Sequence, residues 1–151
     1  LMDLYEARFS PDRDADRNAA CTELRAQIEE ALKSVPSLDH DRIIRRLADL
    51  ILSIQRTNFY QRTRTDAPLP FISFKIASRE LDDLPDPKPY REIFVDSPQV
   101  EGVHCRFGAV ARGGLLWSDR SDDFRNEILG RVKALQGKNA VTVPGGSKGG
   151  F

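Results

Sequence analysis

The sequence predicts an α/β fold in which a pair of helices leads into a sheet. Apolar residues recur at helical spacing in the first half of the chain, alternate with polar residues after residue 70, and return to helical spacing near residue 121. The chain has 151 residues, 40% hydrophobic and 30% charged, which is ordinary for a globular domain. We expect a helical segment at 1–64 and a sheet-containing domain at 65–151.

Two amphipathic helices are expected in the first segment. The stretch 15–35 places apolar residues on one face, and Pro36 ends it. The stretch 39–61 has the stronger pattern, with six residues on one face: Ile43, Ile44, Leu47, Leu50, Ile51 and Ile54. Asp39 and Asp41 lie at its start, where carboxylates interact favourably with the helix dipole.

Strands are expected at 71–77, 91–97 and 103–111. In the first of these, Ile72, Phe74 and Ile76 alternate with polar residues, which predicts a strand with one buried face.

The last part of the chain returns to a helix and then to a strand. Residues 121–136 form the helix, with four residues on one stripe: Phe124, Ile128, Val132 and Leu135. We expect a short final strand at 139–144, followed by a glycine loop around Lys148.

Charge is distributed unevenly although the net charge is zero. Residues 65–105 hold four basic and eight acidic side chains, whereas residues 106–151 hold eight basic and four acidic. The positive end suits a small anionic ligand better than nucleic acid, which usually needs a more basic surface with interleaved aromatics. No apolar run approaches the roughly 20 residues that span a membrane, and the first ten residues are unlike a signal peptide. We therefore expect a cytoplasmic protein.

Metal and nucleotide motifs are missing from the sequence. Cys21 and Cys105 have no metal-ligand spacing, and a disulfide between them has no support. Neither the phosphate-loop pattern GxxxxGK[ST] nor the dinucleotide fingerprint GxGxxG occurs. We expect no metal site in this chain.

Two glycine turns each carry a cation. Arg112 precedes Gly113 and Gly114, Lys148 precedes a second glycine pair, and Lys138 lies between them in the sequence. Arginine can hold a carboxylate through two hydrogen bonds, and a lysine crowded by other cations gives up its proton more readily. Together, three cations around a glycine-walled hollow would suit a small dicarboxylate. Taken singly, each residue is better explained as a turn glycine or a solvated cation.

The chain from residue 92 to 151 resembles the catalytic core of the large NAD-specific glutamate dehydrogenases. The most specific part is ARGGLLWSDR (111–120) combined with KNAVTVPGGSKGGF (138–151). The segments 42–61 and 71–94 resemble the part of those enzymes that leads into the core. The resemblance implies a mixed-sheet substrate domain that is truncated before the Rossmann domain that binds NAD.

The resemblance also implies an activity and residue roles. Members of this family of amino-acid catabolism oxidatively deaminate L-glutamate to 2-oxoglutarate and ammonia, passing hydride to NAD. Lys148 matches the catalytic lysine, Lys138 a lysine that binds substrate carboxylate, and Arg112 with Gly113 and Gly114 the segment that binds the other carboxylate. The fragment alone is expected to be inactive, and its full-length parent is expected to form a homo-oligomer.

Two departures from the family pattern leave alternatives open. Leu116 stands where the large enzymes have arginine, and Phe107 stands where glycine is expected. The loss of a cation at 116 would be consistent with a catalytically inactive homologue that acts as a binding or assembly module. A related amino-acid dehydrogenase is a third possibility, although Arg112 favours a dicarboxylate substrate.

Overall fold

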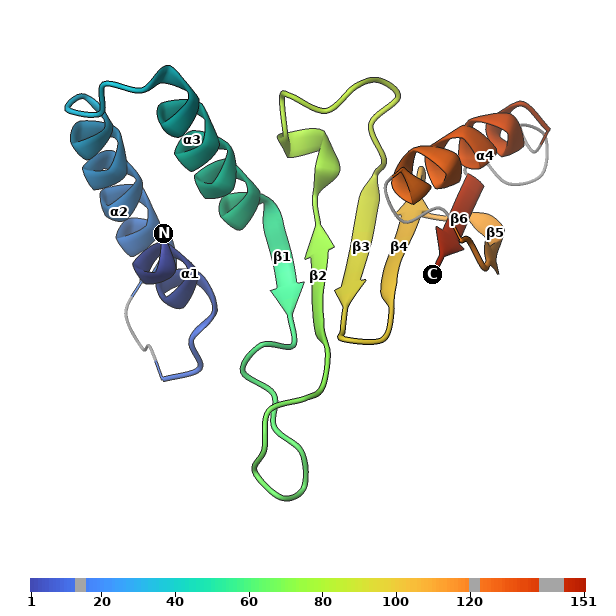
Figure 1. Cartoon of the computed structure of the whole chain (residues 1–151), viewed down its shortest axis with the longest axis horizontal. Coiled ribbons are helices and arrows are strands. Elements are labelled where there is room, and N and C mark those ends of the chain that lie inside the picture. The colour runs from blue at the N-terminus through green and yellow to red at the C-terminus, as the bar shows by residue number, and fades with distance from the viewer. Residues whose placement is uncertain (13–15, 120–122, 139–145) are drawn as a thin grey trace. The chain divides into compact units, whose positions relative to one another are not determined.

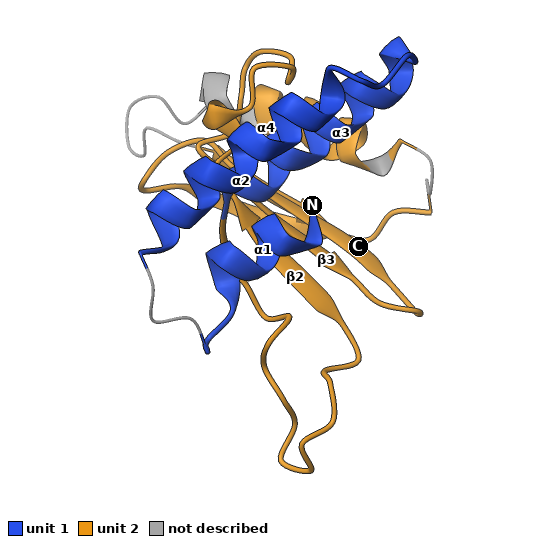
Figure 2. Cartoon of the chain, turned by 90° about the vertical axis from the view of Figure 1, so that its left-hand side faces the viewer, with its two compact units in different colours: residues 1–54 blue, residues 55–151 orange. Residues whose placement is uncertain are grey.

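A computed structural model of the chain describes residues 1–12, 16–119, 123–138 and 146–151. The chain divides into two compact units, residues 1–54 and 55–151 (Figure 2). Helices come first, and a mixed sheet with a further helix follows, so the predicted α/β fold is confirmed.

The described part of the first unit contains three helices, one more than the sequence predicts. They are α1 (Met2–Phe9), α2 (Arg17–Leu32) and α3 (Leu38–Ser53). The pattern analysis does not detect α1 because eight residues are too few to show a clear helical period. The three helices pack around a small core of buried residues: Leu4, Ala7, Cys21 and Ala48.

Capping side chains set the starts of α2 and α3. Oδ1 of Asp16 accepts hydrogen bonds from two backbone N–H groups of α2, at 3.0 and 3.3 Å. Oγ of Ser37 accepts one from the first turn of α3, at 3.4 Å. These bonds satisfy N–H groups that a helix leaves without an internal partner. Asp39 and Asp41 lie in the first turn of α3, as predicted.

The prediction that the second helical stretch continues to residue 61 is wrong. Helix α3 ends at Ser53, and Ile54–Thr57 form strand β1. Ile54 has extended backbone angles, with φ −67° and ψ 125°. Strand β1 is the neighbour of β2 in the sheet. Pairing with a strand distant in the sequence therefore overrides the local helical period.

Six strands in the described residues form one mixed sheet, in the order β1-β2-β3-β4-β6-β5 (Figure 1). The strands after β1 are β2 (Ile72–Ile76), β3 (Arg91–Asp96), β4 (Glu101–Arg106), β5 (Arg112–Leu116) and β6 (Gly146–Gly150). β2, β3, β4 and β6 pair in antiparallel fashion along this order, whereas β5 and β6 are parallel. The three strands expected in this region correspond to β2, β3 and β4, although β4 ends at Arg106 and not at residue 111 as predicted.

Both glycine segments are strands, so the prediction of turns is wrong. Strand β6 lies between β4 and β5, and Arg112–Leu116 forms β5 itself. The low strand propensity of glycine conceals such strands in a sequence. Their glycines allow close packing instead, because a Cβ atom on Gly150 would overlap the side chain of Ile128. The strand expected at 139–144 lies outside the described residues.

Helix α4 (Phe124–Lys138) covers one face of the sheet over β4 and β6 (Figure 1). Ile128 and Val132 are fully buried, which confirms the middle of the predicted apolar stripe. They pack against buried residues in and just after β4: Val103, Cys105 and Phe107. The side chains of Phe124 and Leu135, at the ends of the stripe, lie outside the described part of the structure.

The strand register places the apolar residues of β2 on the face that α4 covers. Phe74 pairs with Phe94, and Phe94 packs against the core beneath α4. Because side chains alternate between faces, Ile72 and Ile76 lie on this face with Phe74. All the residues of β2 are half-buried, however, so the alternation appears in the register and not in the exposure.

Candidate functional site

Arg112 and Lys148 lie on neighbouring strands and on the same face of the sheet. In the parallel β5–β6 pair, Arg112 is opposite Gly146, and Lys148 is opposite Gly114. Their Cα atoms are therefore one strand apart and two residues apart along the strands, about 8 Å in all. Residues 146, 148 and 150 share a face, and Gly150 meets Ile128 of α4. Both cations thus lie on the side of the sheet that α4 partly covers.

Gly114 provides room for the side chain of Lys148. A Cβ atom placed on Gly114 would lie 3.8 Å from Nζ of Lys148. The ammonium group therefore extends over the backbone of β5. Lys148 is half-buried, whereas Arg112 at the start of β5 is exposed. Arg112 and Lys148 could hold one small anion between the half-buried amine of the lysine and the exposed guanidinium of the arginine.

Gly113 is placed differently from its neighbour. A Cβ atom there would overlap the backbone carbonyl oxygen of Ser147 and would lie 2.9 Å from its Oγ. The lack of a side chain at Gly113 allows β5 and β6 to approach each other. The sequence-predicted residues Arg112, Gly113, Gly114 and Lys148 are therefore brought together by one strand pair, although their roles in binding stay predictions.

Lys138 is the last residue of α4. Its side chain lies outside the described residues, as does the connection from 139 to 145 that leads to β6. The structure therefore places only its backbone, at the end of the helix.

A buried ion pair that the sequence analysis did not identify lies in line with Lys148. The register aligns Glu92 on β3, Cys105 on β4 and Lys148 on β6 in one row across the sheet. Glu92 is only 5% exposed. Arg125, in the first turn of α4, donates to both of its carboxylate oxygens, at 2.6 and 2.8 Å. Ser78 Oγ donates a third hydrogen bond, at 3.2 Å.

The pair affects the titration of its neighbours. Hydrogen bonding to Glu92 raises the pKa of Arg125, with burial acting in the opposite direction. Burial, assisted by the negative charge of Glu92, raises the pKa of the Cys105 thiol to about 12. Cys105 is therefore an uncharged thiol at neutral pH. The local sequence around Glu92 or Arg125 does not indicate this pair, because 33 positions separate the two residues.

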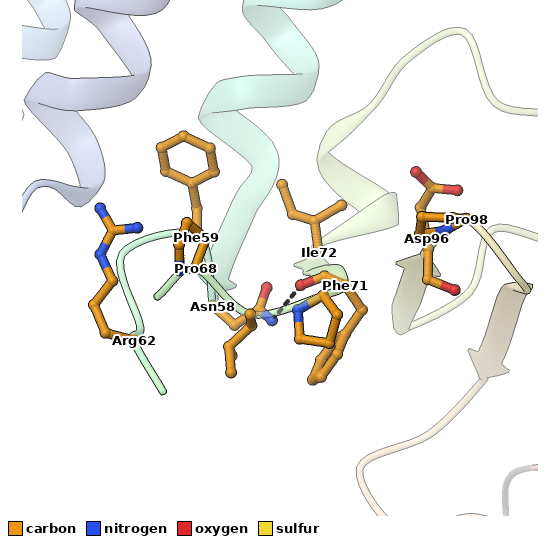
Figure 3. Close-up of a pocket in the computed structure, with 11 residues that line it drawn as sticks. Asn58, Phe59, Arg62, Pro68, Phe71, Ile72, Asp96 and Pro98 are labelled. Carbon is orange, nitrogen blue, oxygen red and sulfur yellow. Dashed lines mark hydrogen bonds between the residues drawn. The ribbon is translucent and has the colours of Figure 1, made fainter. Parts of the chain in front are cut away.

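A second hollow lies away from these cations. A pocket of about 550 Å³ is formed by the loop between β1 and β2 and the turn after β3 (Figure 3). Phe59 and Phe71 line it, together with Pro68. Its buried polar residue, Asn58, is already engaged, because its side chain donates to the carbonyl of Phe71 at 3.0 Å. None of the sequence-predicted site residues lines this pocket.

The described residues show neither a metal site nor a membrane-spanning helix. No group of three or more potential metal-ligating His, Cys, Asp or Glu residues gathers in that part of the chain. Each helix that the structure describes is too short or too polar to cross a bilayer.

Comparisons with known proteins identify the family. Residues 27–151 match the family model for the bacterial NAD-glutamate dehydrogenase catalytic domain. The whole chain aligns with NAD-specific glutamate dehydrogenases of Halomonas elongata and Mycobacterium tuberculosis at 49% identity, and of Pseudomonas aeruginosa at 50% identity. It spans only 9 to 10% of the length of these relatives. Because the family model matches residues 27–151, the chain belongs to the bacterial NAD-glutamate dehydrogenase family.

Proposed function

We propose that this chain supplies the dicarboxylate-binding part of an NAD-dependent glutamate dehydrogenase, which converts L-glutamate to 2-oxoglutarate and ammonia. The observation that carries the proposal is the placement of Arg112 and Lys148 on one face of adjacent strands, with Gly114 leaving room for the lysine amine. The names of the relatives support the choice of substrate and of NAD.

The two cations would divide the work between binding and proton transfer. The exposed guanidinium of Arg112 would hold a substrate carboxylate through paired hydrogen bonds. Lys148 in its protonated form would polarise the carbonyl oxygen of 2-oxoglutarate, and in its neutral form it would activate water against the iminium intermediate. Lys138 would bind the other carboxylate, with Gly113 and Gly114 forming the floor of the site.

The chain lacks the sequence fingerprint with which a Rossmann domain binds NAD. That fingerprint, GxGxxG, lies at a turn between a strand and a helix, and the sequence has no such segment. We assign NAD binding to a domain of the full-length enzyme outside these residues. We expect the fragment alone to be inactive, and the parent to be a cytoplasmic homo-oligomer.

The test is NADH formation from L-glutamate by the full-length enzyme, with and without Lys148→Ala. Loss of a general acid–base group typically lowers kcat by a factor of about 10² to 10⁴. Lys75→Ala is the matched control, because Lys75 lies on β2 of the same sheet at a position that faces away from Lys148. Turnover that survives Lys148→Ala would assign the chemistry to another residue.

The same assay separates the other two interpretations. Leu116, whose identity suggested an inactive homologue, packs against the core beneath α4. An enzyme that oxidises leucine faster than glutamate would be a related amino-acid dehydrogenase. A folded full-length protein that turns over neither amino acid would be a binding or assembly module.

A further inference from the structure

The Glu92–Arg125 pair joins the sheet to the first turn of α4 in the row that holds Lys148. Glu92 carries three hydrogen bonds, two from Arg125 and one from Ser78. A buried carboxylate with this many donors is held in one position. Because Glu92 and Lys148 are two strands apart in register, their Cα atoms are about 10 Å apart.

We propose that Glu92 and Arg125 form a charge-neutral positioning pair for Lys148. The pair holds the start of α4 on the sheet, and Glu92 cancels the positive charge of Arg125, which would otherwise disfavour the protonated form of the lysine. This inference rests on the proposed role of Lys148. The proposal also gives a reason for placing a buried carboxylate beneath α4, since an apolar residue could hold the helix on the sheet as well.

Among the described side chains on the elements that flank Lys148, three other titratable or charged groups do not alter this charge balance; the side chain of Lys138 lies outside the described residues. On β4, Cys105 is an uncharged thiol at neutral pH because its pKa is about 12. On β5, Arg112 is exposed, so water screens its charge. On α4, the carboxylate of Glu127 is engaged by Arg131 at 2.8 Å and by Ser118 at 2.8 Å. Removal of Glu92 would therefore take away the carboxylate that Arg125 contacts among the described residues.

The expected effect can be estimated from the geometry. Nζ of Lys148 extends over Gly114, away from β3, so it lies roughly 12 Å from the pair. At that separation one uncompensated charge shifts a titration by about 0.3 to 1 pH unit, depending on the effective dielectric constant. The direction is fixed, because arginine keeps its proton throughout the assay range. An extra cation moves the protonation of Lys148 to lower pH.

The experiment measures the pH dependence of kcat/KM for glutamate in the full-length enzyme carrying Glu92→Gln. We expect the acid limb, which reports formation of the neutral lysine, to move to lower pH by about 0.3 to 1 unit. The double variant Glu92→Gln/Arg125→Gln removes both charges and should return the limb to its wild-type position. An unshifted limb in the single variant overturns the proposal, and so does an equal shift in both variants, because the cause would then be altered packing.

A second variant and a second measurement keep the proposal testable. If Glu92→Gln does not fold, Arg125→Gln replaces it, with a shift of the limb to higher pH as the supporting result and a shift to lower pH or none as the refuting one. The pH dependence of Lys148 acetylation by acetic anhydride, followed by peptide mass spectrometry, reads the same protonation without turnover. A wild-type enzyme without glutamate activity would defeat the proposed function, whereas an acetylation curve unchanged by Glu92→Gln would defeat the positioning pair.

Discussion

Replacement of Gly113 by alanine should disrupt the β5–β6 pair, whereas the same change at Gly114 should not. A Cβ atom at position 113 would overlap the backbone carbonyl oxygen of Ser147 and would lie 2.9 Å from Ser147 Oγ. At position 114 the nearest described atom is Nζ of Lys148 at 3.8 Å, an ordinary van der Waals contact at the end of a flexible side chain. The two substitutions are chemically identical and lie one residue apart.

The size of the stability loss depends on which atoms must move to relieve the overlap. The overlap at Gly113 is with backbone in the middle of the sheet, since β6 also pairs with β4, so relief requires one strand to shift. Overpacking against rigid surroundings costs about 1 to 3 kcal/mol, and we expect Gly113→Ala to fall near the upper end. In a domain of roughly 100 residues, 3 kcal/mol lowers Tm by about 12 to 24 °C. Gly114→Ala should change the free energy of unfolding by less than about 0.5 kcal/mol.

Thermal and urea unfolding followed by circular dichroism measure both variants. Hydrogen exchange of the 112–116 and 146–150 peptides then shows whether any loss is local to the strand pair. Equal stability of the two variants would refute the argument. It would mean that β5 and β6 do not pair in the register that places Gly113 opposite Ser147 and Gly114 opposite Lys148. Gly114→Ala serves a second purpose, since reduced glutamate turnover with full stability would show that room for the lysine amine matters.

The remaining predictions concern the core beneath α4. Ile128→Ala removes a fully buried side chain and should lower the free energy of unfolding by about 2 to 5 kcal/mol, measured by urea denaturation; a loss below 1 kcal/mol would mean that α4 is not seated on β6. Cys105 should make stability fall with pH. Its pKa is raised from 9.0 to about 12 in the folded protein, so its contribution is complete below pH 9 and is lost as pH rises towards 12. From pH 8 to 11 the unfolding free energy of wild type should therefore fall more steeply than that of Cys105→Ala once the pH exceeds 9, and parallel curves would contradict the assignment.

The sequence by itself determined the elements whose side chains carry a clear period. The alternation in 72–76 and the stripe through Ile128 and Val132 predicted β2 and α4, because these side chains must turn one face to a core. It also determined the candidate cations, Arg112 and Lys148, since a charged residue beside paired glycines is visible without a structure. Side-chain pattern and local chemistry were sufficient for these features.

Only the tertiary structure decided where the cations lie and what surrounds them. Glycine has no side chain to show a period, so the sequence predicts turns at β5 and β6, whereas the pairing of β6 with both β4 and β5 makes them strands. The same pairing placed Glu92 in the row of Lys148, although 56 positions separate them in the sequence. Backbone hydrogen bonds between strands are non-local, and they depend little on which side chains the strands carry. For that reason the register, the buried ion pair and the shared face of Arg112 and Lys148 could be known only from the folded chain.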